Sequence, residues 1–140
     1  MKNSLQRFLD AQEDTYQVAF LEIKNGRKRS HWMWYIFPQI QGLAFSETSK
    51  YFAINDIEEA EAFVRHPILG RRLTEICNEL LKLKSDDASH IFGNPDDLKL
   101  KSSMTLFASV SEADQVFQLV LDKYFNGMQD DKTLQIISKK

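Results

Sequence analysis

The spacing of apolar residues is the feature that most restricts how this chain can fold. Apolar side chains recur every three or four residues in nearly every segment, as they do on one face of an α-helix. The clearest stretches are 5–23, 56–66, 67–84 and 111–126. No run of alternating polar and apolar residues lies between hairpin turns, so strands find little support. The pattern predicts an all-α domain of about seven or eight helices, without a sheet of three or more strands.

Capping residues and helix breakers predict where the helices begin and end. Pro67 and Pro95 suit the first turn of the helices that follow them. Gly26 and Gly127 suit the left-handed position after a helix, and a last helix is expected from about Asp130. Short polar side chains precede five apolar stretches and are the expected N-caps: Asn3 or Ser4, Ser30, Ser46, Asp56 and Ser111.

The length of 140 residues is typical of one domain with a single core, and we expect residues 1–140 to form it. No composition shift, repeat or low-complexity segment divides the chain. The helical stripes predict which side chains are largely buried: Phe8, Phe20, Leu73, Ile76, Leu80, Phe117, Val120 and Leu121.

Composition excludes several classes of protein. The net charge of −2 argues against a general nucleic-acid coat, which would be strongly basic. Cys77 is the single cysteine, so the chain forms no internal disulfide. The polar, acidic N-terminal segment is unlike a signal peptide, and no apolar run approaches the roughly 18 residues of a membrane span. We therefore expect a cytoplasmic protein without a membrane segment.

The aromatic segment SHWMWYIFPQIQG, residues 30–42, is either a slab of core or the wall of a site. It contains both tryptophans and follows the basic run at 24–29. Cations beside exposed aromatic faces are typical of nucleotide receptors. On a helix, Trp32 and Trp34 point about 200° apart, so one core cannot easily bury both. We expect Trp32, Met33 and Ile36 to anchor the core, and His31, Trp34 and Gln39 to line a polar-rimmed cleft.

A second segment, DDLKLKSSMTLF at 96–107, places polar residues within an apolar helix. Asp97, Lys99, Lys101 and Ser102 are expected to form the wall opposite the aromatic segment. Mid-helix serines also serve close packing, and Asp97 with Lys101 has the spacing of a plain surface ion pair.

A third segment, HPILGRRL at 66–73, places arginines at the start of a helix. Gly70 lets something approach the backbone, and a cation is unfavourable near a helix N-terminus. Arg71 and Arg72 are therefore candidate contacts for an anion, with solvated surface as the alternative.

These segments carry a resemblance to a known family. HWMWYIFPQIQGL, KYFAI, HPILGRRL, IFGNPDDLKLKSSMTLF and GMQDDKTLQII together resemble the domain-of-unknown-function family numbered 1810, from Leu5 to Ile137. The resemblance implies an all-helical protein of bacterial type and implies no activity.

The order of the motifs is also similar to the NADAR superfamily. Those small helical proteins are implicated in cleaving N-glycosidic bonds in ADP-ribose-related or ribosylated-base compounds. Their Glu-His-Tyr-Phe run supplies a key carboxylate, whereas here Ser49 and Lys50 precede Tyr51 and Phe52. Glu47, on the same expected helix, is the candidate to replace that carboxylate.

Two classes of function remain open. One is an N-glycosidic hydrolase acting on a nucleotide-like compound, which needs a carboxylate to activate water, cations for phosphate and an aromatic surface for the base. The other is a non-enzymatic module that binds a nucleotide or a protein. Neither a metal nor a cofactor is expected, and nucleic acid is expected only through a modified base. The candidate catalytic residues are Glu47, Asp97 and His31, and the candidate ligand-binding residues are Trp32, Trp34, Gln39, Tyr51, Arg71, Arg72, Lys99, Lys101 and Ser102.

Overall fold

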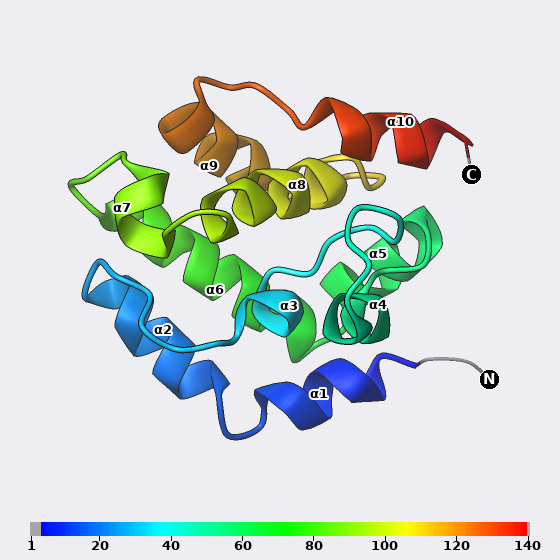
Figure 1. Ribbon diagram of the computed structural model, residues 1–140, viewed down its shortest axis with the longest axis horizontal. Helices are drawn as coiled ribbons and strands as arrows, with labels where there is room; N and C mark the ends of the chain where they lie inside the picture. The colour runs from blue at the N-terminus through cyan, green and yellow to red at the C-terminus, as the bar shows by residue number, and fades with distance from the viewer. Residues whose placement is uncertain (1–3, 140) are drawn as a thin grey trace.

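Helices account for nearly all the regular structure between residues 4 and 139, the range that the computed structural model describes (Figure 1). An isolated parallel bridge between Ile40 and Ile54 is the sole strand-like pairing in this range. The predicted all-α fold is confirmed, but the predicted number of helices is too low. Ten are present: α1 (Gln6–Gln12), α2 (Tyr16–Lys24), α3 (Met33–Ile36), α4 (Glu47–Phe52), α5 (Ile57–Arg65), α6 (Leu69–Lys82), α7 (Ala88–Phe92), α8 (Asp96–Ala108), α9 (Val116–Phe125) and α10 (Asp131–Lys139).

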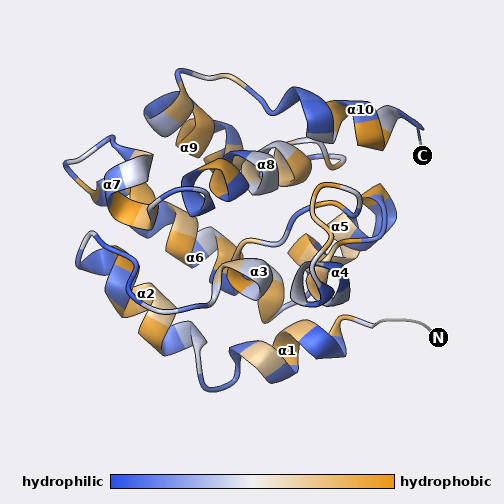
Figure 2. Ribbon diagram, in the orientation of Figure 1, coloured by the Kyte–Doolittle hydropathy of each residue, from blue (hydrophilic) through white to orange (hydrophobic). Residues whose placement is uncertain are grey.

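Helix α6 lies at the centre of the molecule, with α2, α5 and α9 packed around it. Hydrophobic and hydrophilic residues alternate along it, as Figure 2 shows. Its buried side chains recur every three or four residues, so one stripe faces the core and the other faces solvent. The stripe consists of Leu69, Leu73, Ile76, Cys77 and Leu80.

Helix α8 is the second buried helix, in contact with α5, α7, α9 and α10. All six residues from 102 to 107 are buried, so this stretch of α8 has no side that faces solvent. Small hydroxyl residues there let neighbouring helices approach. Thr105 donates to the carbonyl of Lys101 at 2.8 Å, whereas Ser103 is buried without a hydrogen-bond partner.

Seven of the eight predicted core residues are buried, and Phe20 is the exception. Phe20 is partly buried because it packs at the edge of the core, against the ring of Tyr16 with centroids 6.1 Å apart. The remaining seven are at most 2% exposed: Phe8, Leu73, Ile76, Leu80, Phe117, Val120 and Leu121.

Two of the predicted N-caps are confirmed. The Ser46 hydroxyl accepts a hydrogen bond from the Ser49 amide at 3.1 Å, and the Asp56 carboxylate accepts one from the Glu59 amide at 2.8 Å. Gly26 adopts the predicted left-handed conformation after α2, with φ of +86°. Ser4 accepts a hydrogen bond from the Gln6 amide, and Asn3 lies outside the described residues.

The predicted first helix, 5–23, is wrong as a single element because a turn at 13–15 divides it into α1 and α2. The buried side chain of Gln12 stabilises this turn, because its side-chain amide nitrogen donates to the carbonyl of Tyr35 at 2.8 Å. The break lets each half meet its own partner: α1 packs on α3, and α2 packs on α6.

The remaining differences also concern short elements. Helix α7 was not predicted because it has a single turn, which Asp87 caps through the His90 amide at 3.1 Å. Ser111 does not cap α9, because a turn follows it and the helix begins only at Val116, whose amide donates to Asp114. Ser30 does not cap α3, because its hydroxyl donates to Glu22 instead.

None of the helices between residues 4 and 139 combines the length and the apolarity that crossing a membrane requires.

Candidate functional site

A hollow lies between α3, α4 and the segment that connects them. Trp34 and Gln39, two of the predicted cleft residues, line it together with Ser49 from α4. The space enclosed by the hollow is small, about 20 Å³. The rest of its surface is mainly apolar: Ile40, Leu43, Ala44, Phe52 and Ala53. We call this feature the Trp34 hollow.

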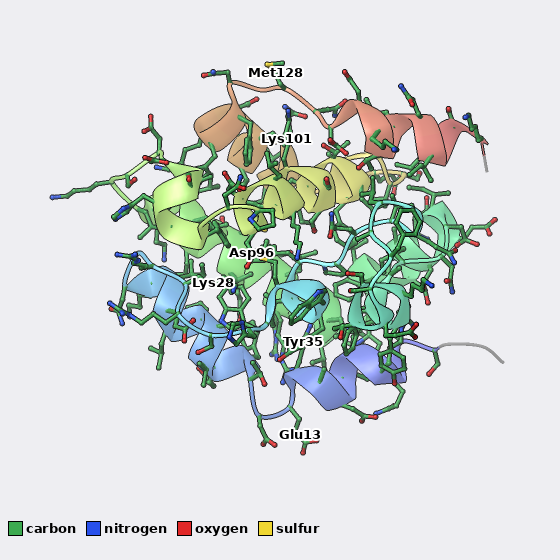
Figure 3. All side chains as sticks on the ribbon, viewed as in Figure 1. Glu13, Lys28, Tyr35, Asp96, Lys101 and Met128 are labelled. Carbon is green, nitrogen blue, oxygen red and sulfur yellow. The ribbon has the colours of Figure 1, made fainter. Side chains whose placement is uncertain are left out.

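The N-terminus of α8 meets the aromatic segment at Trp34. The ammonium nitrogen of Lys99 lies 5.4 Å from the centre of a Trp34 ring, within the range of a cation–π interaction. Asp96 pairs with Lys99 at 3.4 Å and with Lys28 at 2.9 Å. Two lysines therefore share the carboxylate of Asp96, and a second carboxylate, that of Asp97, lies in the same helical turn. In Figure 3, Asp96 lies beside Lys28, whereas Lys101 lies across α8 from both.

A short backbone pairing closes the segment that carries the hollow. The amide of Gln41 donates to the carbonyl of Ile54 at 2.8 Å, and the amide of Ile54 donates to the carbonyl of Gln39 at 2.8 Å. The intervening residues, 41–53, include α4 and bury none of their side chains completely. The hollow is thus walled on one side by a peripheral segment and on the other by the core.

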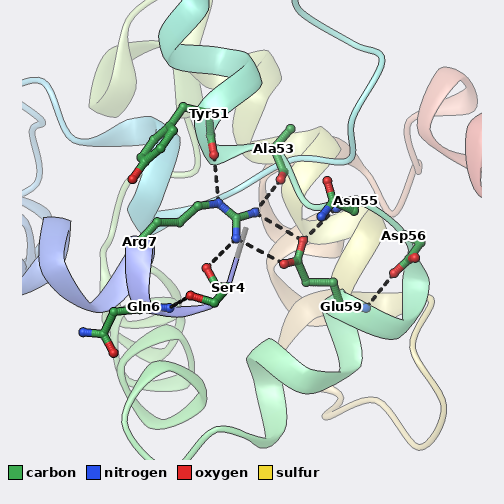
Figure 4. A network of polar contacts seen from close by, with 8 residues as sticks. All are labelled: Ser4, Gln6, Arg7, Tyr51, Ala53, Asn55, Asp56 and Glu59. Atoms are coloured by element: carbon green, nitrogen blue, oxygen red, sulfur yellow. Dashed lines mark hydrogen bonds and ion pairs between the residues drawn. The ribbon is translucent and has the colours of Figure 1, made fainter. Parts of the chain in front are cut away.

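Arg7 fixes the C-terminal end of this segment from α1, as Figure 4 shows. Its guanidinium donates to the carbonyl of Tyr51 at 2.8 Å and to that of Ala53 at 2.7 Å. It also forms a two-pronged ion pair with Glu59, at 3.1 and 3.2 Å, and donates to the carbonyl of Ser4. All five N–H groups of this nearly buried arginine are therefore satisfied. This network is architectural, because no donor is left for a ligand.

Trp32 belongs to the core and not to the hollow. It is 0% exposed, as predicted for a core anchor, and Met33 and Ile36 are buried with it. Its indole nitrogen donates to Glu22 at 2.9 Å. No ring face is open to a ligand, so its place in the predicted ligand-binding set is corrected.

Glu22 organises the basic turn before α3. Its carboxylate also accepts hydrogen bonds from the amides of Arg29 and Ser30, at 2.8 and 3.0 Å. Burial alone would raise the pKa of Glu22, but the hydrogen bonds from Ser30, Arg29 and Trp32 hold it below its usual value. Sequence reasoning missed this residue because its partners lie up to ten positions away.

The other predicted residues of α8 do not meet Trp34. Ser102 donates to Asp130 at 3.2 Å, and Asp130 also accepts from the amide of Thr133 at the start of α10. Asp97 accepts from its neighbour Asn94 at 3.1 Å. The face of α8 that reaches Trp34 carries Asp96 and Lys99, which are three residues apart. The predicted site included Lys99 but not Asp96.

The HPILGRRL segment has structural reasons for its glycine and histidine. A Cβ atom on Gly70 would lie 2.0 Å from the carbonyl oxygen of Val64, so the close approach is that of α5 and not of a ligand. The Nδ1 atom of His66 accepts hydrogen bonds from the amides of Ile68 and Leu69 at the start of α6. Sequence reasoning could have found this contact, because His66 lies only two and three positions before the amides that it accepts from.

The two arginines of that segment lie apart from the Trp34 hollow. Arg72 donates to Gln12 at 3.2 Å and lies over the ring of Tyr16 at 5.1 Å. It therefore joins α6 to the turn between α1 and α2, while Arg71 is exposed. Neither arginine lines the hollow.

None of the three candidate catalytic groups lines the Trp34 hollow. Glu47 is exposed in the first turn of α4, His31 is exposed before α3, and Asp97 is partly exposed on α8. Tyr51 is exposed on α4, with its ring edge against Phe52. Between residues 4 and 139, no three His, Cys, Asp or Glu side chains gather closely enough to hold a metal ion.

Comparison with known proteins decides the family. Residues 2–137 match the family described as "Protein of unknown function (DUF1810)". The chain belongs to the DUF1810 family. This confirms the first of the two predicted resemblances and has no bearing on the NADAR resemblance.

The fold of this DUF1810 protein is similar to a solved one. The crystal structure of the conserved hypothetical protein Rv1873 from Mycobacterium tuberculosis aligns with a TM-score of 0.94 at 42% sequence identity, over 97% of each chain. No curated protein matches the chain. The comparisons therefore establish the family and the fold of the chain, and they assign no activity to it.

Proposed function

We propose that this DUF1810 protein binds a small nucleotide-like ligand at the Trp34 hollow without chemical turnover. The observation that carries the proposal is that Trp34 lines the hollow while the ammonium nitrogen of Lys99, which lies outside the lining, is 5.4 Å from the centre of its ring. A half-buried indole offers a stacking surface to a planar base, which is worth about 1–3 kcal/mol per base in nucleic-acid complexes. The Gln39 amide supplies both a donor and an acceptor for the edge of such a base.

The charge near Trp34 supports an anionic group on the ligand. Lys28 and Lys99 share the single carboxylate of Asp96, and the cluster lies at the N-terminus of α8, where the helix dipole is positive. A phosphate at Lys99 would form a charge-assisted hydrogen bond with the ammonium group. A nucleotide places its phosphate a few ångströms from its base, which matches an ammonium group next to the stacking ring.

The hollow is shallow, so a ligand would lie over it and not inside it. The enclosed space is about 20 Å³, roughly enough for one water molecule. A planar base would therefore stack against Trp34 at the opening, with its phosphates extending outward along α8.

The residues that line the hollow favour binding over hydrolysis. Cleavage of an N-glycosidic bond requires a carboxylate next to the anomeric carbon. None of the described residues that line the hollow carries a carboxylate. Glu47, which would replace the carboxylate of the NADAR pattern, is exposed on α4. Hydrolysis is therefore the second candidate, and it would require Glu47 to turn inward.

A role in protein interaction is supported by two exposed aromatic side chains near the hollow. Phe45 is 73% exposed and Tyr51 is 54% exposed, on the segment that walls the hollow. Tyrosine and phenylalanine are enriched at protein interfaces. These residues would contact a partner protein that binds this segment when the hollow holds its ligand.

A ligand screen by thermal unfolding tests the proposal. The panel is adenine, AMP, NAD and ADP-ribose. A ligand at about 100 times its dissociation constant adds about 2.7 kcal/mol, which raises the Tm of a domain this size by several degrees. We expect a phosphorylated compound to raise the Tm of the wild-type protein and the W34A variant to abolish this shift. The K99M variant should bind the compound at least about tenfold more weakly and therefore show a smaller shift.

The matched control is K101M, which removes the same charge across α8 from Trp34. It should keep the full shift. If no compound changes the Tm of the wild-type protein, or if W34A and wild type respond alike, the proposal is wrong. Product analysis of the same NAD and ADP-ribose mixtures distinguishes hydrolysis from binding.

A further inference from the structure

A second cleft, which shares no lining residue with the Trp34 hollow, lies between α5, α6 and the segment that connects α8 to α9. Its volume is about 200 Å³. Two stretches that are distant in sequence build it: residues 64–65 with Thr74, from α5 and α6, and residues 110–114 with Phe117. Its apolar lining consists of Val64, Val110, Ala113 and Phe117. We call it the α5–α9 cleft.

Side chains of both charge signs line this cleft. Arg65 lies on the α5 side and is 63% exposed, with one long ion pair to Glu61 at 3.8 Å. Glu112 and Asp114 lie on the opposite side, on the connection between α8 and α9. Within residues 4–139 no hydrogen bond or ion pair engages the Glu112 carboxylate, and Asp114 uses one oxygen to cap α9. Most of the charged atoms are therefore available to a ligand.

Glu112 is held in a backbone conformation that glutamate rarely adopts. Its φ is +55°, in the left-handed region that favours glycine. Asn126 also has a positive φ, but it ends α9, where asparagine is common. Glu112 ends no helix, and a strained residue of this kind often lies at a functional site. The strain fixes the direction of a carboxylate-bearing residue at the wall of a cleft.

We propose that the α5–α9 cleft binds a free α-amino acid with an apolar side chain. The carboxylate of the ligand binds Arg65, and its ammonium group binds Glu112 and Asp114. Its side chain lies on the apolar lining formed around Phe117. A zwitterion matches walls of opposite charge, and an apolar floor selects among zwitterions by side chain. The inference is independent of the Trp34 hollow, because no residue lines both.

Titration by NMR tests this assignment on the intact chain. The probe is L-leucine up to about 10 mM, which covers the millimolar affinities of small ligands. We expect the amide signals of Val110, Ala113 and Phe117 to shift together with one Kd. The compound 4-methylpentanoate, which lacks the ammonium group, and isoamylamine, which lacks the carboxylate, should each bind at least about tenfold more weakly.

Variants of each wall complete the test. R65Q and E112Q should each raise the Kd for L-leucine about tenfold or more, whereas E58Q removes a carboxylate outside the cleft and should leave it unchanged. E112G keeps the left-handed turn without strain, so its Tm should not fall although binding is lost. The proposal is overturned if L-leucine moves no signal in the cleft, or if the two truncated analogues bind as well as the amino acid.

Discussion

At the scale of single residues, Glu22 shows how one carboxylate shapes the entrance to the aromatic segment. We expect E22Q to destabilise the protein by about 2 kcal/mol at pH 7, because a neutral amide cannot accept from Ser30, Arg29 and Trp32 at once. The folded protein holds the pKa of Glu22 below that of the unfolded chain, about 4.3. This contribution is therefore complete above that unfolded pKa and is lost as the pH falls below it.

Urea unfolding of wild type and E22Q at pH 7 and at pH 3.5 measures this effect. The two proteins should differ clearly at pH 7 and less at pH 3.5. The exposed Glu13 supplies the control, since E13Q should behave as wild type at both values. An equal difference between wild type and E22Q at the two pH values would contradict the assigned role.

At the scale of elements, the approach of α5 to α6 depends on Gly70. A methyl group there would overlap the backbone carbonyl of Val64, which belongs to a helix and cannot rotate away. We expect G70A to cost at least about 1–3 kcal/mol, although alanine normally stabilises a helix relative to glycine. Thermal unfolding measures it, with N78A on the exposed face of α6 as the control. A G70A protein as stable as wild type would show that the two helices are not in contact.

Elements also show what the sequence could and could not predict. Caps such as Ser46 and Asp56 act on amides three residues away, so a short window contains the whole interaction. The break after Gln12 depends on Tyr35 and Arg72, which lie 23 and 60 positions away. The same limit applies to the site. Trp32 is buried and Trp34 is only partly buried, as predicted, but Trp32 precedes α3, so the helical angle is not the reason. The choice of Asp96 rather than Asp97 depended on how α8 is rotated against the aromatic segment.

At the scale of the whole molecule, the ion pair of Arg7 and Glu59 joins the first helix to the middle of the chain. We expect R7M to cost about 3–5 kcal/mol, because it leaves a partly buried carboxylate unpaired and two carbonyls without their donor. The double variant R7M/E59Q should recover part of this loss. Urea unfolding of wild type, R7M, E59Q and the double variant gives the coupling free energy. R71M, on the exposed face of α6, is the control. Additive losses would show that the two groups do not interact.

The closed segment 41–53 has a consequence for how this architecture could acquire new specificities. Its ends meet at the buried pair Ile40 and Ile54, and the residues between them bury no side chain completely. Arg7 holds the segment through the main-chain carbonyls of Tyr51 and Ala53, contacts that any amino acid at those positions would provide. The exposed positions of this segment can thus be exchanged on a constant framework, in the manner of a grafted loop, and the wall of the hollow changes while the core keeps its sequence. Gly42, which has a φ of +107°, and Leu43 and Phe52, which pack against the core, belong to the constant framework.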